Sequence, residues 1–280
     1  MFELSFSFGF AIIVFALCAE YIDSTLGMGY GTALTPILLI LGFDPLQVVP
    51  AVLLSELVTG LFAGFTHHSF GNVNFKPKTI SIFRIIRACK SYGIRESASR
   101  GLPRALKVTL VISCCSVVGS VSAVFLAVQM SPLLLKTIIG ILILIVGIVI
   151  IITAGKEYMF SWKRILILGV VASFNKGLSG GGYGPVVTGG QLISGVDGKN
   201  AIAITSVAEG LTCLVGIVTY LALNRSIDLM LAPYLLIGAL ISVPISAFTV
   251  KHLSPHVFKP LIGAITAFMG GLSLFKVFFL

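Results

Sequence analysis

Two glycine-rich turns, each holding a Gly-Tyr-Gly triplet, are the parts of this 280-residue chain best suited to chemistry. The first is Gly29-Tyr30-Gly31 and the second is Gly182-Tyr183-Gly184, and each lies between two apolar segments. Glycine lets backbone amides approach a ligand without an intervening side chain, and the helix that follows each turn adds free N–H groups and the positive end of its dipole. Such turns favour an anion. Close helix packing through small residues is the alternative interpretation.

Two carboxylates, Glu56 and Glu209, follow the turns at matching distances and lie near the middle of apolar segments. A carboxylate at such depth is costly and usually functional. One hypothesis is proton coupling, in which the buried group binds and releases a proton. The other is a structural brace, which the symmetry favours slightly because coupling needs only one such group. Lys176 and Asp23 occupy equivalent positions at the turn entrances, where Lys176 would either attract an anion or pair with Asp23.

Hydroxyl groups and tyrosine rings at the same turns complete the candidate binding site. The tyrosines would gate the site or donate hydrogen bonds, and the hydroxyls would bind solute or cap the helices. The predicted substrate-binding residues are Ser24, Thr25, Gly27, Gly29, Tyr30, Gly31, Lys176, Ser179, Gly180, Gly181, Gly182, Tyr183 and Gly184, with Glu56 and Glu209 as coupling or brace residues. The sequence carries no recognisable catalytic set, cofactor motif or metal-ligand cluster. We therefore predict neither an enzyme nor a bound cofactor or metal.

The elements that must position these residues are apolar helices. Hydrophobic residues make up 57% of the chain and charged residues 10%, with a mean hydropathy of +1.08, whereas soluble chains carry about 25% charged residues. Ten apolar segments are predicted, at about 5–22, 29–42, 46–66, 106–129, 132–154, 164–176, 182–194, 199–222, 229–250 and 257–279. The second, sixth and seventh are shorter than the roughly 20 residues of a straight span. We expect these three to be half-helices, re-entrant arms or spans buried in protein.

The two halves of the chain repeat one another. Residues 27–66 match residues 180–219 without a gap, and 13 of these 40 positions are identical, so coincidence is a poor explanation. The ends of the halves match in a second register that aligns Ser131 with Ser254. The two offsets, 153 and 123, differ by 30 residues, which is the extra length of the first half.

Basic residues orient the halves. Nine of the 19 Lys and Arg residues lie between Lys76 and Lys107, which is typical of a cytoplasmic loop rather than of nucleic-acid binding. The predicted single transmembrane domain, 1–280, consists of a first repeat at 1–155, with a basic cytoplasmic insertion at about 69–104, and a second repeat at 156–280. The counterpart of the basic loop carries little positive charge, so we expect it to face outward. We therefore predict an all-α polytopic membrane protein with two inverted-topology helical repeats, broken or re-entrant helices meeting at the Gly-rich turns, and both termini outside.

The basic insertion has an amphipathic pattern, with Ile82, Ile85, Ile86 and Cys89 on one helical face. The pattern predicts a helix resting on anionic membrane lipid, with a regulatory or partner-docking role as the alternative. The oligomeric state is not predicted.

Three stretches resemble the TauE/SafE family of sulfite and organosulfur transporters. They are Leu26–Pro36 with Glu56, Gly177–Pro185 with Glu209, and the run His67-His68…Gly71-Asn72-Val73. The resemblance covers nearly the whole chain and implies an inner-membrane protein that moves sulfur-containing anions such as sulfite, thiosulfate or sulfonates. The long basic insertion departs from the family pattern.

Together these patterns predict a secondary membrane transporter of small anions that works by alternating access. Glu56 or Glu209 is the candidate for proton coupling. A passive anion channel built from the same turns is the first alternative, and an intramembrane enzyme is a less favoured second.

Overall fold

The computed structural model describes residues 6–76, 102–153, 161–194, 196–223 and 230–252, together with scattered positions between 264 and 278. The helices assigned in these ranges are α1 (Phe6–Leu26), α2 (Tyr30–Ile40), α3 (Pro45–Ser69), α5 (Arg104–Gln129), α6 (Pro132–Thr153), α7 (Trp162–Ser179), α8 (Tyr183–Ile193), α9 (Gly198–Ala222) and α10 (Ala232–His252). The described part of the chain contains no strand, so the predicted all-α class is confirmed there. The predicted amphipathic helix around 82–89 lies outside the described residues, as does most of the tenth apolar segment.

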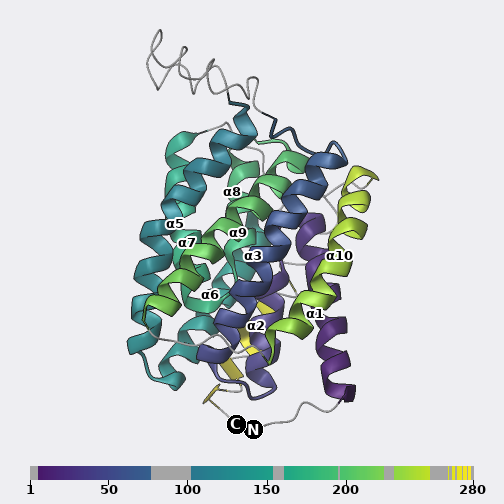
Figure 1. Ribbon diagram of the computed structural model, residues 1–280. Coiled ribbons are helices and arrows are strands. Elements are labelled where there is room, and N and C mark those ends of the chain that lie inside the picture. Colours follow the sequence, from purple (N-terminus) through teal and green to yellow (C-terminus); the bar gives the residue numbers. More distant parts are fainter. Residues whose placement is uncertain are drawn as a thin grey trace.

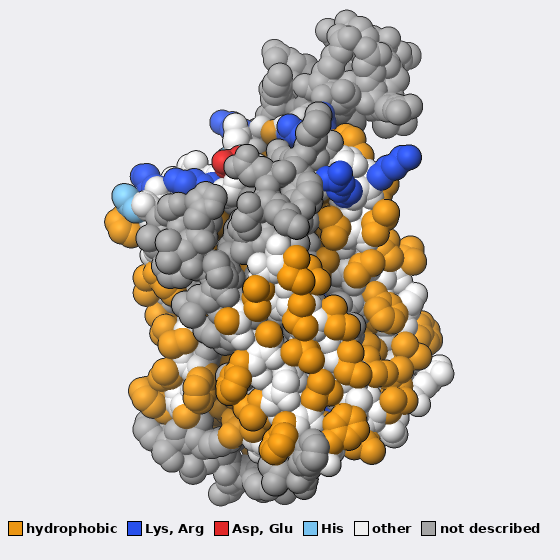
Figure 2. All heavy atoms as spheres, turned by 180° about the vertical axis from the view of Figure 1, so that it is seen from behind, with side chains coloured by type: hydrophobic (Ala, Val, Ile, Leu, Met, Phe, Trp, Pro, Cys, Tyr) orange, Lys and Arg blue, Asp and Glu red, His pale blue; other side chains and the backbone are white. Residues whose placement is uncertain are grey.

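Five of the helices, α1, α3, α5, α9 and α10, have the length and apolar composition of membrane spans. Hydrophobic side chains are spread over the described part of the visible flank, and Lys and Arg side chains gather at one end (Figure 2). Phe10, Val118 and Ile167 are each more than half exposed. Large apolar side chains on so much of the surface are unfavourable in water and are expected where helices face lipid.

The long helices pack in pairs (Figure 1). Helix α1 lies along α10, α5 lies along α7, and α3 packs against α9 in the middle. Glycines permit close approach at each crossing, because a Cβ on Gly60, Gly119 or Gly238 would contact a backbone carbonyl oxygen of the facing helix. Small residues at helix crossings are the usual means of close packing in membranes, where burial from water contributes little between helices.

Helices α2 and α8 have 11 residues each, which corresponds to about 16 Å of helix. This confirms the prediction that the segments after the two turns are too short for a straight span. The sixth apolar segment, however, was predicted too short, because α7 has 18 residues and continues through Lys176 to Ser179. Helix α1 likewise continues past Asp23 to Leu26. Hydropathy ends at these polar residues, but the helices do not, because the polar side chains have buried partners.

Helices α3 and α9 begin at equivalent aspartates. The Asp44 side chain accepts a hydrogen bond from the backbone N–H of Leu46, and Gln47 completes a capping box. Asp197 accepts from the backbone N–H of Asn200. An aspartate before the first helical turn satisfies amides that have no partner within the helix. The repeated Asp is therefore explained by helix capping.

Candidate functional site

The two glycine-rich turns pack directly against each other. A Cβ on Gly31 would overlap the carbonyl oxygen of Gly180, and a Cβ on Gly184 would lie 2.5 Å from the carbonyl oxygen of Gly27. These contacts are equivalent, because Gly31 aligns with Gly184 and Gly27 with Gly180 in the sequence repeat. Gly27 and Gly180 also have φ values of 68° and 69°, which favour glycine. In this conformation the absence of side chains at these glycines allows the two backbones to pack in direct contact.

Hydrogen bonds also join the turns across the contact. The backbone N–H of Gly182 donates to Thr32 Oγ1 at 2.8 Å, and the hydroxyl of Thr188 lies 2.5 Å from the carbonyl oxygen of Gly27. Thr188 also lies 2.9 Å from Thr205 Oγ1 on α9. Sequence reasoning missed these threonines, although the identity of Thr188 with its repeat counterpart Thr35 was a signal.

A buried lysine and two glutamates lie beside this contact. Lys176 Nζ donates to Glu209 Oε1 at 2.8 Å and also forms an ion pair with Glu56 Oε2. Glu56 Oε1 accepts the backbone N–H of Gly31 at 3.0 Å. Lys176 is fully buried, and the exposed fractions of Glu56 and Glu209 are 2% and 4%. The three side chains, one each from α7, α3 and α9, form what we call the ion triad.

The carboxylate of Glu56 links the start of α2 to Lys176 on α7. A carboxylate at a helix N-terminus is favoured by the helix dipole, and one bound to a lysine is also compensated in charge. Asp23, the repeat counterpart of Lys176, accepts the backbone N–H of Tyr30 at 3.3 Å. The structure thus pairs Lys176 with the two glutamates and directs Asp23 to the turn backbone.

The two tyrosines of the turns are buried in different surroundings. The hydroxyl of Tyr30 lies 2.7 Å from Ser55 Oγ and 3.3 Å from the carbonyl oxygen of Leu235. Tyr183 packs in an apolar cluster with Val187, Ile204 and neighbouring side chains. Neither ring is exposed, so any gating role requires a different conformation from this one.

The predicted hydroxyl residues make local contacts. Ser24 Oγ donates to Glu20 Oε1 at 2.6 Å, and Ser179 Oγ accepts the backbone N–H of Gly181 at 3.1 Å. Thr25 is buried at the end of α1, and its hydroxyl has no hydrogen-bond partner among the described residues. Ser179 therefore stabilises the second turn, and Ser24 binds the carboxylate of Glu20 on the same helix.

A histidine clamp joins three helices on the basic side of the turns. His67 Nε2 lies 3.0 Å from the carbonyl oxygen of Ser24, and Asn72 Nδ2 lies 3.0 Å from His67 Nδ1 and 2.9 Å from the carbonyl oxygen of Ala247. An amide nitrogen only donates, so Nδ1 accepts and Nε2 carries the proton of a neutral ring. The histidine and asparagine of the family-like run thus connect α3 to α1 and α10. Among the described residues, no His, Cys, Asp and Glu side chains are grouped to hold a metal ion.

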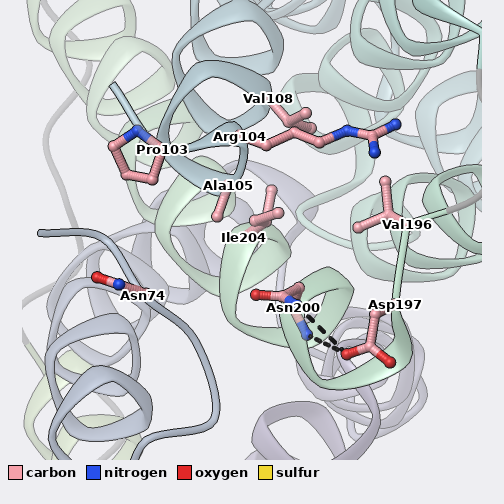
Figure 3. Close-up of a pocket in the computed structure, with 9 residues that line it drawn as sticks. All are labelled: Asn74, Pro103, Arg104, Ala105, Val108, Val196, Asp197, Asn200 and Ile204. Carbon is pink, nitrogen blue, oxygen red and sulfur yellow. Dashed lines mark hydrogen bonds between the residues drawn. The ribbon is translucent and has the colours of Figure 1, made fainter. Parts of the chain in front are cut away.

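A pocket of about 370 Å³ opens between the start of α5 and the start of α9 (Figure 3). Arg104, Asn74 and Asn200 line it, and Asn200 Nδ2 donates to Asp197 Oδ2 at 3.3 Å. The pocket lining on α9 ends at Ile204, five residues before Glu209, and no residue of the ion triad is part of the lining. The pocket is therefore a feature separate from the ion triad.

The fold and site together define a class of protein. Apolar helices long enough to cross a membrane enclose a buried ion triad and two broken-helix turns, an arrangement typical of membrane transporters rather than of soluble proteins.

Comparison with known proteins agrees with this class. The family model for the sulfite exporter TauE/SafE matches residues 12–88 and 90–272, and the chain belongs to that family. The chain is also similar to the probable membrane transporter protein YtnM of Bacillus subtilis (strain 168), with 26% identity over 259 residues that cover 90% of this chain and 79% of that protein. No solved structure matches the chain. The protein is therefore a multi-pass membrane protein of a transporter family.

Proposed function

We propose that this protein is a secondary carrier of small sulfur-containing anions, such as sulfite, thiosulfate or sulfonates, with a binding site at the two turns and the ion triad. The observation that carries the proposal is Lys176, a fully buried cation at the contact of the turns. A buried ionisable residue inside a membrane domain is costly and is expected where a solute passes. The sulfur chemistry comes from the family description alone.

In the proposed carrier, the groups that would bind the anion are bound to the protein's own carboxylates in the substrate-free state. Lys176 Nζ and the backbone N–H of Gly31 bind Glu56, and Lys176 also binds Glu209. A small anion entering the site would take over one of these donors, and the displaced glutamate would turn towards water. The substrate then competes with the protein's own carboxylates. These carboxylates also occupy the anion-binding groups when no substrate is bound.

Two inverted repeats would give alternating access around this site. Helices α1 and α7 are equivalent in the first sequence register, and α5 and α10 are equivalent in the second. Helix α1 of the first half packs against α10 of the second, and α7 of the second half packs against α5 of the first. Each pair is therefore the counterpart of the other when the two halves are exchanged. A pseudo-two-fold arrangement of this kind is the plan of inverted-repeat carriers, in which one half moves against the other.

Charge sets the proposed orientation. The end of the molecule where Lys and Arg side chains gather would face the cytoplasm, together with the basic insertion at 69–104 (Figure 2). The termini would face outward, and the insertion would contact anionic lipid of the inner membrane.

Uptake into liposomes that contain the purified protein tests the substrate class. We expect saturable uptake of sulfite, thiosulfate or a sulfonate, competition among these anions, and weak uptake of carboxylates. Uptake should increase when the outside is made acidic if the anion moves with a proton. Protein-free liposomes give the control. Non-saturating, ohmic anion current would favour the channel instead, and saturable uptake restricted to carboxylates would contradict the sulfur-anion assignment.

A further inference from the structure

A third buried glutamate lies beside the ion triad. Glu20, on α1, is 2% exposed. Its Oε1 accepts from Ser24 Oγ at 2.6 Å, and its Oε2 accepts from Thr59 Oγ1 at 3.3 Å. Both partners are neutral hydroxyls. Glu20 is therefore held in place without charge compensation from these contacts.

The charged groups around Glu20 are mostly of the same sign. Asp23 on its own helix, Glu56 on α3 and Glu209 on α9 are carboxylates in its electrostatic surroundings. Lys176 on α7 is the nearby cation, and it is bound to Glu56 and Glu209.

The remaining neighbours do not alter that balance. His67 on α3 has the neutral form fixed by its two hydrogen bonds. The basic residues of α10, Lys251 and His252, lie in its last turn, at the surface. Among the residues that the structure describes, none forms an ion pair with Glu20.

This balance limits how many of the carboxylates are ionised together. With all four ionised, the group would carry one positive and four negative charges away from water. An uncompensated buried ion is strongly unfavourable, so a carboxylate without a cation tends to bind a proton instead. Glu20 meets this condition, and its two hydroxyl neighbours are able to solvate either protonation state because a hydroxyl both donates and accepts.

Two of the four carboxylates, Glu20 and Asp23, have no acidic counterpart in the repeat, whereas Glu56 and Glu209 are counterparts of each other. Asp23 accepts the backbone N–H of Tyr30 at the start of α2, where the helix dipole favours a negative charge. Glu20, whose counterpart is Ser173, accepts only from hydroxyls. A symmetric pair suits a structural role on both sides of the contact. Coupling needs a single group whose charge changes once per cycle. An acidic residue without an acidic counterpart in the other repeat provides such a group.

We infer that Glu20 is the proton-binding residue that couples anion movement to the pH gradient, while Glu56 and Glu209 hold the turns and Lys176. This inference rests on the proposed carrier function. In the cycle, the Glu20 carboxylate takes one proton when the site faces the acidic side and releases it to the other side, so one proton crosses with each cycle and no bond other than O–H forms or breaks.

Glu20→Gln tests the inference because glutamine keeps the shape of the side chain and removes its proton chemistry. In liposomes, the variant should still exchange labelled anion for unlabelled anion across the membrane. It should lose accumulation driven by an acidic outside, which for one proton per anion is about tenfold for each unit of pH difference. Ser173→Ala, at the equivalent position of the second half, should keep the wild-type response.

Infrared difference spectra give a readout that does not depend on transport. The wild-type protein should show a protonated-carboxyl band that disappears at alkaline pH, and Glu20→Gln should lack it. If Glu20→Gln does not fold, Glu20→Asp should shift this band and the pH profile of uptake.

Several results would overturn the inference. They are wild-type gradient-driven accumulation in Glu20→Gln, an unchanged band and pH profile in Glu20→Asp, or loss of the gradient response in Asp23→Asn with Glu20→Gln unaffected. If the wild type moves no anion at all, the proposed function fails. The infrared band still shows in that case whether Glu20 binds a proton. If Glu20→Gln has the same spectrum as the wild type, Glu20 is not a proton-binding residue.

Discussion

Replacing Lys176 by methionine is expected to abolish transport and to destabilise the folded protein severely. The substitution leaves Glu56 and Glu209 buried beside each other without the cation that both contact. Removing one partner of a buried ion pair costs about 3–5 kcal/mol, and here two carboxylates lose their partner. The yield of monodisperse protein in detergent and its thermal unfolding midpoint measure the effect.

Neutralising the carboxylates should partly reverse it. Adding Glu56→Gln and Glu209→Gln to Lys176→Met should raise the unfolding midpoint without restoring transport, because the solute still lacks its cation. Lys199→Met is the matched control, since Lys199 donates to the carbonyl oxygen of Lys251 at the surface. A Lys176→Met protein with wild-type midpoint and wild-type flux would show that the ion triad contributes to neither.

Adding a single methyl group at Gly31 should also disrupt the protein. Gly31 lies within α2 and does not have a positive φ, so alanine suits its backbone conformation and would favour an unpacked helix by about 1 kcal/mol. The methyl group, however, would overlap the carbonyl oxygen of Gly180, a backbone atom that cannot turn aside. We expect this steric overlap to outweigh the gain in helix propensity. The loss in free energy of unfolding should exceed the roughly 1–3 kcal/mol typical of overpacking.

The unfolding midpoint and the uptake rate of Gly31→Ala should therefore both fall sharply. Gly184→Ala, which meets Gly27 in the equivalent contact, should behave in the same way. Gly271→Ala is the control, because a Cβ there has open space. If Gly31→Ala were as stable and active as Gly271→Ala, the direct packing of the two turns would not describe the working protein.

The sequence predicted the turns because their signal is local and repeated. Gly-Tyr-Gly recurs with a matching glutamate, and short apolar segments follow both copies. The positions of α2 and α8 follow from these patterns. The ends of α1 and α7 were harder to predict, because the hydropathy falls at Asp23 and Lys176. The helices continue past these residues because tertiary contacts satisfy their side chains.

The partners of Lys176 depended on information that the sequence does not contain. An anion and Asp23 were both reasonable partners from spacing alone, and only the packing of α3, α7 and α9 brings Glu56 and Glu209 to the same nitrogen. The environment of Glu20 could not be predicted either, because a position one helical turn before Asp23 is compatible with water and with the protein interior. Burial decides between these environments, and burial follows from how α1 packs in the bundle.

Counterflow is the most direct test of the central claim that this protein is an anion carrier with its site at the turns. Liposomes with the purified protein are loaded with unlabelled sulfite, thiosulfate or a sulfonate and diluted into a trace of the same labelled anion. A carrier should accumulate label transiently above its equilibrium level, and Lys176→Met, rescued in stability by Glu56→Gln and Glu209→Gln, should not. Label that only equilibrates in the wild type, or an overshoot that survives in the rescued Lys176→Met protein, would contradict the account.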